Sequence, residues 1–129
     1  MIQRFIEIGE GYSDLYELIE IANTNNHRID KLICLQTIKD EKQMCSFVVT
    51  LHPASPGHVY PLYICREGIP HFSWKETNRY TLFTSLASKL QKEIYTLDVR
   101  HSSSFQEKDL YYSYLIGVLR MNRIIPPLQ

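Results

Sequence analysis

The sequence predicts an α+β fold, in which helices pack on a mostly antiparallel sheet. Segments rich in β-branched residues are interspersed with segments of helical periodicity, and two of the β-rich segments are separated only by a short polar loop, as in a hairpin. The predicted order of elements is β-α-β-β-β-α-β-α. A chain of 129 residues has the length of one domain, so residues 1–129 are expected to form a single domain with one core.

The first strand and the first helix are predicted within residues 2–26. Residues 2–8 are β-rich and stop at Gly9 and Gly11, which permit a sharp turn. A helix is expected next, with Ser13 or Asp14 as its N-cap, and residues 23–26 favour its end. Its apolar positions have helical spacing and are Leu15, Leu18, Ile19 and Ala22.

Residues 29–38 and 44–51 are predicted to form two antiparallel strands joined by the polar loop 39–42. If Lys39 pairs with Lys42, Gln36 lies opposite Cys45 and Cys34 lies opposite Phe47. This register places an apolar face toward the helices, formed by Cys45, Phe47, Val49 and Leu51.

Another strand and the second helix are predicted within residues 59–94. Loop 52–58 contains two prolines and a glycine, and strand character resumes at residues 59–65 before a second loop at 67–70. Ser73 and Glu76 have the spacing of a capping box. The helix expected after them has one apolar stripe, formed by Phe83, Leu86, Ala87, Leu90 and Ile94.

The last strand and helix are predicted within residues 95–127. Residues 95–100 alternate in polarity, and the preceding helix allows a crossover, so this strand can join the sheet in parallel. Ser104 and Glu107 form a second candidate capping box, and the two prolines at 126–127 end the helix. Its expected stripe is Leu110, Tyr114, Val118 and Met121. The order of the strands stays open.

Charge and composition narrow the classes of function. Fourteen Lys and Arg balance fourteen Asp and Glu without any basic run, which disfavours nucleic acid as a partner. Charges interrupt the first fifteen residues, and no apolar run is long enough to cross a bilayer, so we expect a cytoplasmic protein with no membrane partner. Cys34, Cys45 and Cys65 are odd in number and lie in strand-like segments, which is typical of buried free thiols in a reducing cytosol.

The strongest candidate for a small-molecule site is the strand-to-helix junction at residues 98–104. Exposed N–H groups at the positive end of a helix would suit a phosphate or a carboxylate there. The alternative is structural, with Ser104 capping the helix and Arg100 pairing with Asp98 or another surface acid. The candidate anion-binding residues are Arg100, His101, Ser102, Ser103 and Ser104.

A metal site and a catalytic nucleophile have less support. Zinc would require His52, His58, Cys65 and His71 to converge, but their spacing matches no compact zinc motif, so neither a metal nor a cofactor is predicted. Cys65 precedes a cationic residue that could lower its pKa, yet no nucleophile motif accompanies it. The sequence therefore contains no recognisable catalytic signature.

Two surfaces are candidates for protein contacts. One is the loop around Arg66 and Glu67, and the other is the last helix, where tyrosines cluster and Tyr112 is expected to be exposed. Gly117 weakens this helix unless another backbone lies close to it, which favours packing against the sheet or a partner.

Three segments carry a family resemblance that spans the chain. Residues 1–13 (MIQRFIEIGEGYS), 61–70 (PLYICREGIP) and 109–122 (DLYYSYLIGVLRMN) resemble a small uncharacterised protein family of Bacillus-type Gram-positive bacteria. The resemblance implies a bacterial cytosolic protein, and it implies no activity or cofactor.

Two functions are therefore expected to compete. The first is a non-catalytic binding or protein-interaction module, with a protein partner or a second copy of the chain as its target. The second is an enzyme or sensor that binds a phosphorylated or carboxylated small molecule at residues 98–104.

Overall fold

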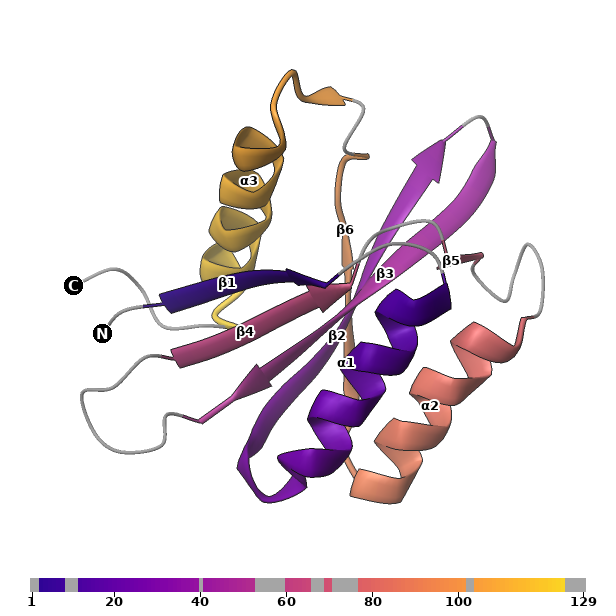
Figure 1. Ribbon diagram of the computed structural model, residues 1–129. Helices are drawn as coiled ribbons and strands as arrows, with labels where there is room; N and C mark the ends of the chain where they lie inside the picture. The colour runs from indigo at the N-terminus through magenta and orange to yellow at the C-terminus, as the bar shows by residue number, and fades with distance from the viewer. Residues whose placement is uncertain are drawn as a thin grey trace.

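The computed structural model describes residues 3–8, 12–39, 41–52, 60–65, 69–70, 77–101 and 104–124, and within them it confirms the α+β class (Figure 1). The strands are β1 (Gln3–Ile8), β2 (Ile29–Lys39), β3 (Lys42–Leu51), β4 (Tyr60–Cys65), β5 (Ile69–Pro70) and β6 (Ile94–Asp98). The helices are α1 (Tyr12–Thr24), the 3-10 helix η1 (Asn26–Arg28), α2 (Asn78–Leu90) and α3 (Lys108–Met121). The predicted order is therefore confirmed, with the short β5 and η1 added.

The sheet contains parallel and antiparallel pairs, and β3 is its central strand. The strand order is β1-β4-β3-β2-β6, and β5 pairs with β3 beside this path. β3 pairs antiparallel with β2, β4 and β5, whereas the β1–β4 and β2–β6 pairs are parallel. The parallel arrangement that the sequence allowed for the last strand is thus confirmed.

Helices cover both faces of the sheet (Figure 1). The α1/α2 core lies under α1 and α2 and includes Leu15, Leu18, Phe47 and Phe83, all fully buried. The α3 core lies on the other face, under α3, and includes Ile33, Val48, Leu115 and Leu119. The sheet supplies both cores because successive residues of a strand point to opposite faces.

The predicted hairpin register is confirmed. Lys39 pairs with Lys42, Gln36 with Cys45 and Cys34 with Phe47. The four apolar side chains predicted to share a face all lie in the α1/α2 core: Cys45, Phe47, Val49 and Leu51.

The sequence analysis missed a β-bulge at the start of β2. Ile29 pairs with Leu51 and Lys31 with Thr50, so Asp30 is an extra residue in β2. The bulge shifts the alternation by one residue, and Ile29 and Leu32 therefore both enter the α1/α2 core.

The first two helices begin at different residues from those predicted. α1 already includes Tyr12, ahead of both expected N-caps. Thr77 is the N-cap of α2, and its side chain accepts a hydrogen bond from the Tyr80 N–H. Ser73 and Glu76 lie outside the described residues, four positions or fewer before this cap.

α2 also ends earlier than the predicted stripe. Gln91 adopts a left-handed conformation (φ 56°) and closes the helix, so Ile94 lies in β6 rather than on α2. Ile94 nevertheless packs against the α1/α2 core, which explains why its spacing resembled that of the helix.

The last helix buries a different stripe from the predicted one. Glu107, not Ser104, is the N-cap of α3 and makes no side-chain cap hydrogen bond. The side chains turned to the sheet are Tyr111, Leu115 and Leu119, whereas Leu110 is 52% exposed and Met121 85% exposed. Two apolar stripes run along α3, and the sheet buries the one that the sequence analysis did not choose, although Tyr114 of the predicted stripe also packs against the α3 core.

Candidate functional site

The segment predicted to bind an anion does not lie at a helix start. Ser104 sits in a short 3-10 turn, where its N–H donates to the carbonyl of His101 at 3.0 Å. α3 begins after Glu107, so an acidic residue occupies the cap, near the positive end of the helix dipole. Ser102 and Ser103 lie outside the described residues, and anion binding by this segment stays a prediction.

Tyr114 of α3 holds Arg100 in place. The Arg100 N–H donates to Tyr114 Oη at 3.0 Å, and the guanidinium carbon lies 6.0 Å from the ring centroid. Asp98 Oδ1 accepts a hydrogen bond from Gln36 Nε2 at 3.3 Å. The structural alternative paired Arg100 with Asp98 or another surface acid, and the ion pairs among the described residues involve only Asp30. Phe105 packs on the same tyrosine ring at a centroid distance of 5.1 Å. The loop after β6 is therefore anchored to the middle of α3.

The three cysteines are free and buried, as predicted. The Phe47 N–H donates to Cys65 Sγ at 3.2 Å. A hydrogen bond with Cys34, followed by burial, raises the pKa of the Cys45 thiol well above its ordinary value. Metal binding and nucleophilic attack both need a thiolate, so the raised pKa makes Cys45 a poor candidate for either.

The four residues considered for zinc are only partly covered by the structure. Cys65 is buried at the end of β4, and His52 follows β3 with an exposed side chain, while His58 and His71 lie outside the described residues. Within the described part of the chain, no group of three or more His, Cys, Asp or Glu residues is placed to hold a metal ion.

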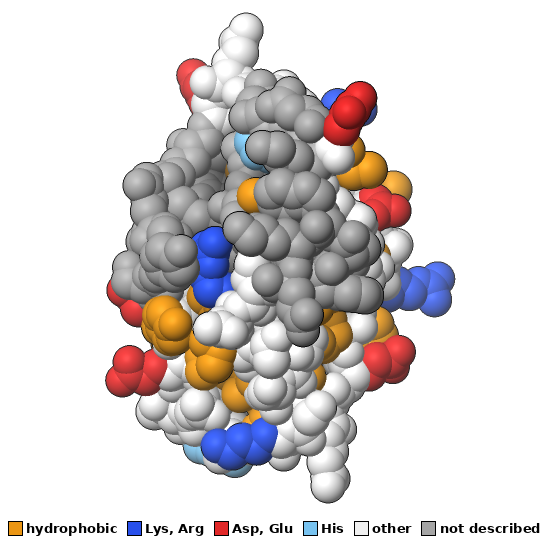
Figure 2. Space-filling view, turned by 90° about the vertical axis from the view of Figure 1, so that its right-hand side faces the viewer, with side chains coloured by type: hydrophobic (Ala, Val, Ile, Leu, Met, Phe, Trp, Pro, Cys, Tyr) orange, Lys and Arg blue, Asp and Glu red, His pale blue; other side chains and the backbone are white. Residues whose placement is uncertain are grey.

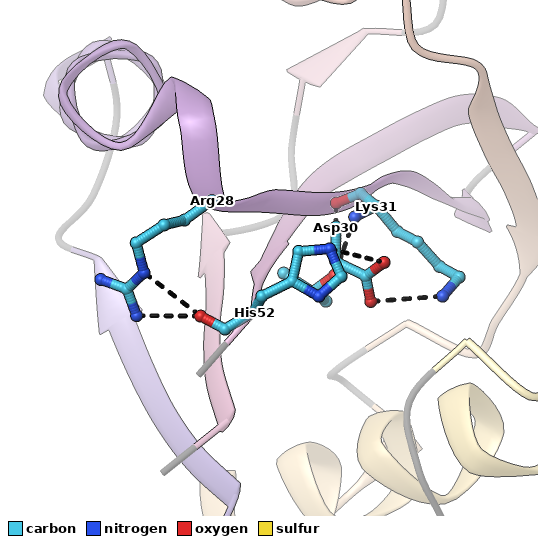
Figure 3. A network of polar contacts seen from close by, with 5 residues as sticks. Arg28, Asp30, Lys31 and His52 are labelled. Carbon is cyan, nitrogen blue, oxygen red and sulfur yellow. Dashed lines mark hydrogen bonds and ion pairs between the residues drawn. The ribbon is translucent and has the colours of Figure 1, made fainter. Parts of the chain in front are cut away.

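The β-bulge organises a polar network that the sequence analysis missed (Figure 3). Arg28 donates from Nε and Nη2 to the His52 carbonyl, at 3.2 and 2.9 Å. Asp30 Oδ2 lies 3.3 Å from Lys31 Nζ, and Asp30 Oδ1 lies 3.6 Å from His52 Nε2.

Thr50 completes this arrangement from β3. Its Oγ1 accepts a hydrogen bond from the Lys31 N–H at 3.0 Å and donates to the Lys31 carbonyl at 3.5 Å. The network ties the ends of β2 and β3 together. Because the His52 side chain is 60% exposed, the pair with Asp30 is a surface contact rather than an enclosed catalytic dyad.

The surfaces predicted for protein contacts differ in how much of them the structure describes. Arg66 and Glu67 lie outside the described residues, and Tyr112 is placed in α3 without a described side chain. Figure 2 shows charges of both signs spread over the visible face, with no patch of one sign among the described residues. A surface hollow along α1 is lined by Glu17, Glu20, Ile21, Thr24 and Asn25, all from one short stretch of chain.

The stripe on α3 that contains the exposed Leu110 and Met121 is the clearest candidate site, and Tyr114 between them is half-buried and packs against the α3 core. Leu110, Tyr114, Gly117 and Met121 are spaced by four, three and four residues, so they share one face of the helix. A Cβ atom added at Gly117 would meet no other atom within 4 Å, so the sheet does not pack against this glycine. The prediction that Gly117 faces the sheet or a partner is therefore wrong for the sheet.

Comparison with known proteins identifies the family of this chain, and the function of that family is unknown. The family model described as a domain of unknown function, DUF7147, matches residues 1–125. No curated protein and no solved structure matches the chain. None of the helices in the described residues is long and apolar enough to cross a membrane.

Proposed function

We propose that this protein is a non-catalytic protein-interaction domain that binds its partner through α3. The chain belongs to the DUF7147 family, whose description names no function, so the proposal rests on the exposed side chains of the protein. The observation that carries the proposal is the exposure of Leu110 and Met121 on the same face of that helix. The sequence resemblance supports a setting in the cytosol of a bacterium.

The spacing of the stripe favours a helical partner. Apolar positions separated by four, three and four residues form the seam of two packed helices, since they keep one face toward the neighbour. Gly117 in the middle of the seam has no side chain and would let a second backbone approach closely. Met121 at the end is flexible and adapts to irregular apolar surfaces. We therefore expect an amphipathic helix of another protein as the partner.

Among the described residues, the side chains capable of catalysis or metal binding lie away from α3 or are engaged in structural contacts, and they do not share one site. The thiols are buried in the α1/α2 core, the Asp30–His52 contact lies at the ends of β2 and β3, and Arg100 is held against Tyr114. This separation supports binding rather than catalysis as the role.

The proposal is tested by placing a charge in the seam. Full-length protein serves as bait in cell extract, and retained proteins are identified by mass spectrometry. Gly117→Arg puts a long cation into open space, so the fold should persist while the partner is lost. Ser85→Arg is the matched control, because Ser85 is also an exposed small residue in a helix but lies on α2, on the opposite face of the sheet from α3.

The expected result is a protein retained by the wild type and by Ser85→Arg and lost with Gly117→Arg. A synthetic peptide of its amphipathic helix should then bind the purified wild type in calorimetry. Retention of the same proteins by all three baits, or of none by any, would show that α3 is not a docking surface.

A further inference from the structure

Among the described strands, β6 is the less protected of the two strands that end the sheet. β6 ends the strand order, and none of its five residues is buried, although Ile94 and Leu97 contact the two cores. Apart from Asp98, its sequence IYTLD has no charge and no proline, which are the usual protections of an edge. The opposite edge, β1, contains Arg4 and Glu7.

The backbone groups that face this free edge can be identified. The Val99 N–H donates to the carbonyl of Gln36 at 2.8 Å, and Gln36 lies opposite Asp98 in the parallel ladder. Successive residues of a strand direct their N–H and C=O groups to opposite sides. The groups of residues 95, 97 and 99 therefore face β2, and those of Ile94, Thr96 and Asp98 face the open edge.

We propose that a second copy of this chain pairs with this edge, β6 antiparallel to β6, so that two sheets become one. The two copies are related by a two-fold axis normal to the sheet, so equivalent side chains of both copies lie on the same face of the joined sheet. Each copy then offers the other the same row of backbone donors and acceptors. In the register centred on Tyr95, Ile94 lies opposite the partner's Thr96. Because both residues face the open edge, each such pair exchanges two backbone hydrogen bonds.

Charge complementarity favours this register over the one centred on Thr96. With Tyr95 on the axis, Asp98 at the end of each β6 comes near the partner's Lys92, which lies in the turn before β6 and closes α2 through its N–H to the Ala87 carbonyl, so the ammonium group of one copy faces the carboxylate of the other on both sides of the axis. Moving the centre to Thr96 would instead place Lys92 opposite the partner's Arg100, and Ile94 opposite a carboxylate. Two like charges and a buried apolar–carboxylate contact disfavour that alternative.

Tyr95 is the residue for which the proposed pairing forms the closest side-chain contact. Its side chain is 39% exposed, and in the proposed dimer it meets its own copy at a non-hydrogen-bonded position, where cross-strand side chains come closest. Aromatic pairs at such positions stabilise the ladder. The β6 edge is separate from the α3 seam, and pairing through it does not require the partner proposed for α3.

Sedimentation equilibrium of the full-length protein tests the pairing. The wild type should form a concentration-dependent dimer. Thr96→Pro removes an N–H that faces the free edge and leaves the N–H groups bonded to β2 in place, so it should raise the dimer dissociation constant about tenfold or more with an unchanged far-UV spectrum. Thr96→Val keeps the N–H and should leave the dimer intact.

A charge exchange tests the register. Asp98→Lys should weaken the dimer by opposing two lysines, and the double variant Lys92→Asp with Asp98→Lys should restore it. A wild type that stays monomeric at high concentration overturns the proposal, as does a dimer that Thr96→Pro leaves unchanged. A double variant that is no tighter than Asp98→Lys overturns the register. A dimer broken by Gly117→Arg and not by Thr96→Pro would place self-association on α3 instead.

Discussion

Aromatic side chains decide the packing beneath α2. Phe83 stacks on Phe47 with ring centroids 4.0 Å apart, and Tyr80 meets the same Phe47 ring edge-on at 5.6 Å. These contacts join the start and the middle of α2 to the centre of β3. They also bring the Tyr80 hydroxyl into an apolar region that contains Cys34 and Cys45.

This environment makes stability depend on pH in the alkaline range. Burial, and then the neighbouring Cys34 and Cys45, raise the pKa of Tyr80 to about 12. In the unfolded chain the pKa of a tyrosine is about 10. The folded state therefore holds the proton more tightly, so the stabilising contribution is complete below about pH 10 and is lost as the pH rises toward about 12.

Urea unfolding of the wild type and of Tyr80→Phe across this range measures the effect. We expect the free energy of unfolding of the wild type to fall more steeply above about pH 10, because only the wild type has a partly buried phenol whose pKa is raised in the folded state. The raised pKa of the Cys45 thiol lowers stability at alkaline pH in both proteins, so its effect cancels in the comparison. Parallel pH profiles for the two proteins would refute the assignment to Tyr80.

At the scale of elements, the bulge in β2 depends on one hydroxyl. Thr50 is fully buried, and its Oγ1 accepts a hydrogen bond from the Lys31 N–H at the point where the register shifts. Thr50→Val keeps the shape and removes the acceptor, so it should lower the free energy of unfolding by about 1–3 kcal/mol.

Thr50→Ser is the matched control for the bulge. It keeps the acceptor and loses only a methyl group, so chemical denaturation should show a smaller loss than for Thr50→Val. If Val were tolerated better than Ser at this position, packing rather than the hydrogen bond would support the bulge.

The elements differ in how far the sequence could predict them. The hairpin register followed from a short loop and a clear alternation, and these two signals agree. The start of α2 was missed because Ser73 and Thr77 are both good capping residues, and local sequence does not rank them. On α3, both stripes are apolar, and only packing against the sheet decides that Leu115 is buried and Leu110 is exposed.

The candidate site was harder to predict than the fold for a related reason. Leu110 and Met121 were expected in the core because the sequence gives them the same spacing as core residues. Likewise, Arg100 was expected at a helix start, and its contact with Tyr114 joins residues fourteen positions apart. Which side chains are exposed, and which distant residues touch, is decided only when the helices pack on the sheet.

At the scale of the molecule, the two cores share one sheet. β2 contributes Leu32 to the α1/α2 core and Ile33 to the α3 core, so loss of packing on one face should be transmitted to the other. Leu115→Ala, which opens a cavity only in the α3 core, should cost about 2–5 kcal/mol.

Native-state hydrogen exchange tests whether the chain unfolds as one domain. Slowly exchanging amides of α1 and of α3 should lose the same protection in Leu115→Ala if both unfold in one cooperative step. Wild-type protection in α1 combined with reduced protection in α3 would instead divide the molecule into two cooperative units.

The central position of β3 also has a consequence for the order of folding. Its ladder with β2 joins neighbours across a tight turn, from Lys39 opposite Lys42 to Ile29 opposite Leu51, whereas β1 must find β4 with Gln3 opposite Tyr60. Short loops close with a smaller entropy loss and therefore sooner. We expect the β2–β3 hairpin to serve as the template on which β4 and β6 dock, and β1 to pair last, because its partner β4 lies far along the chain.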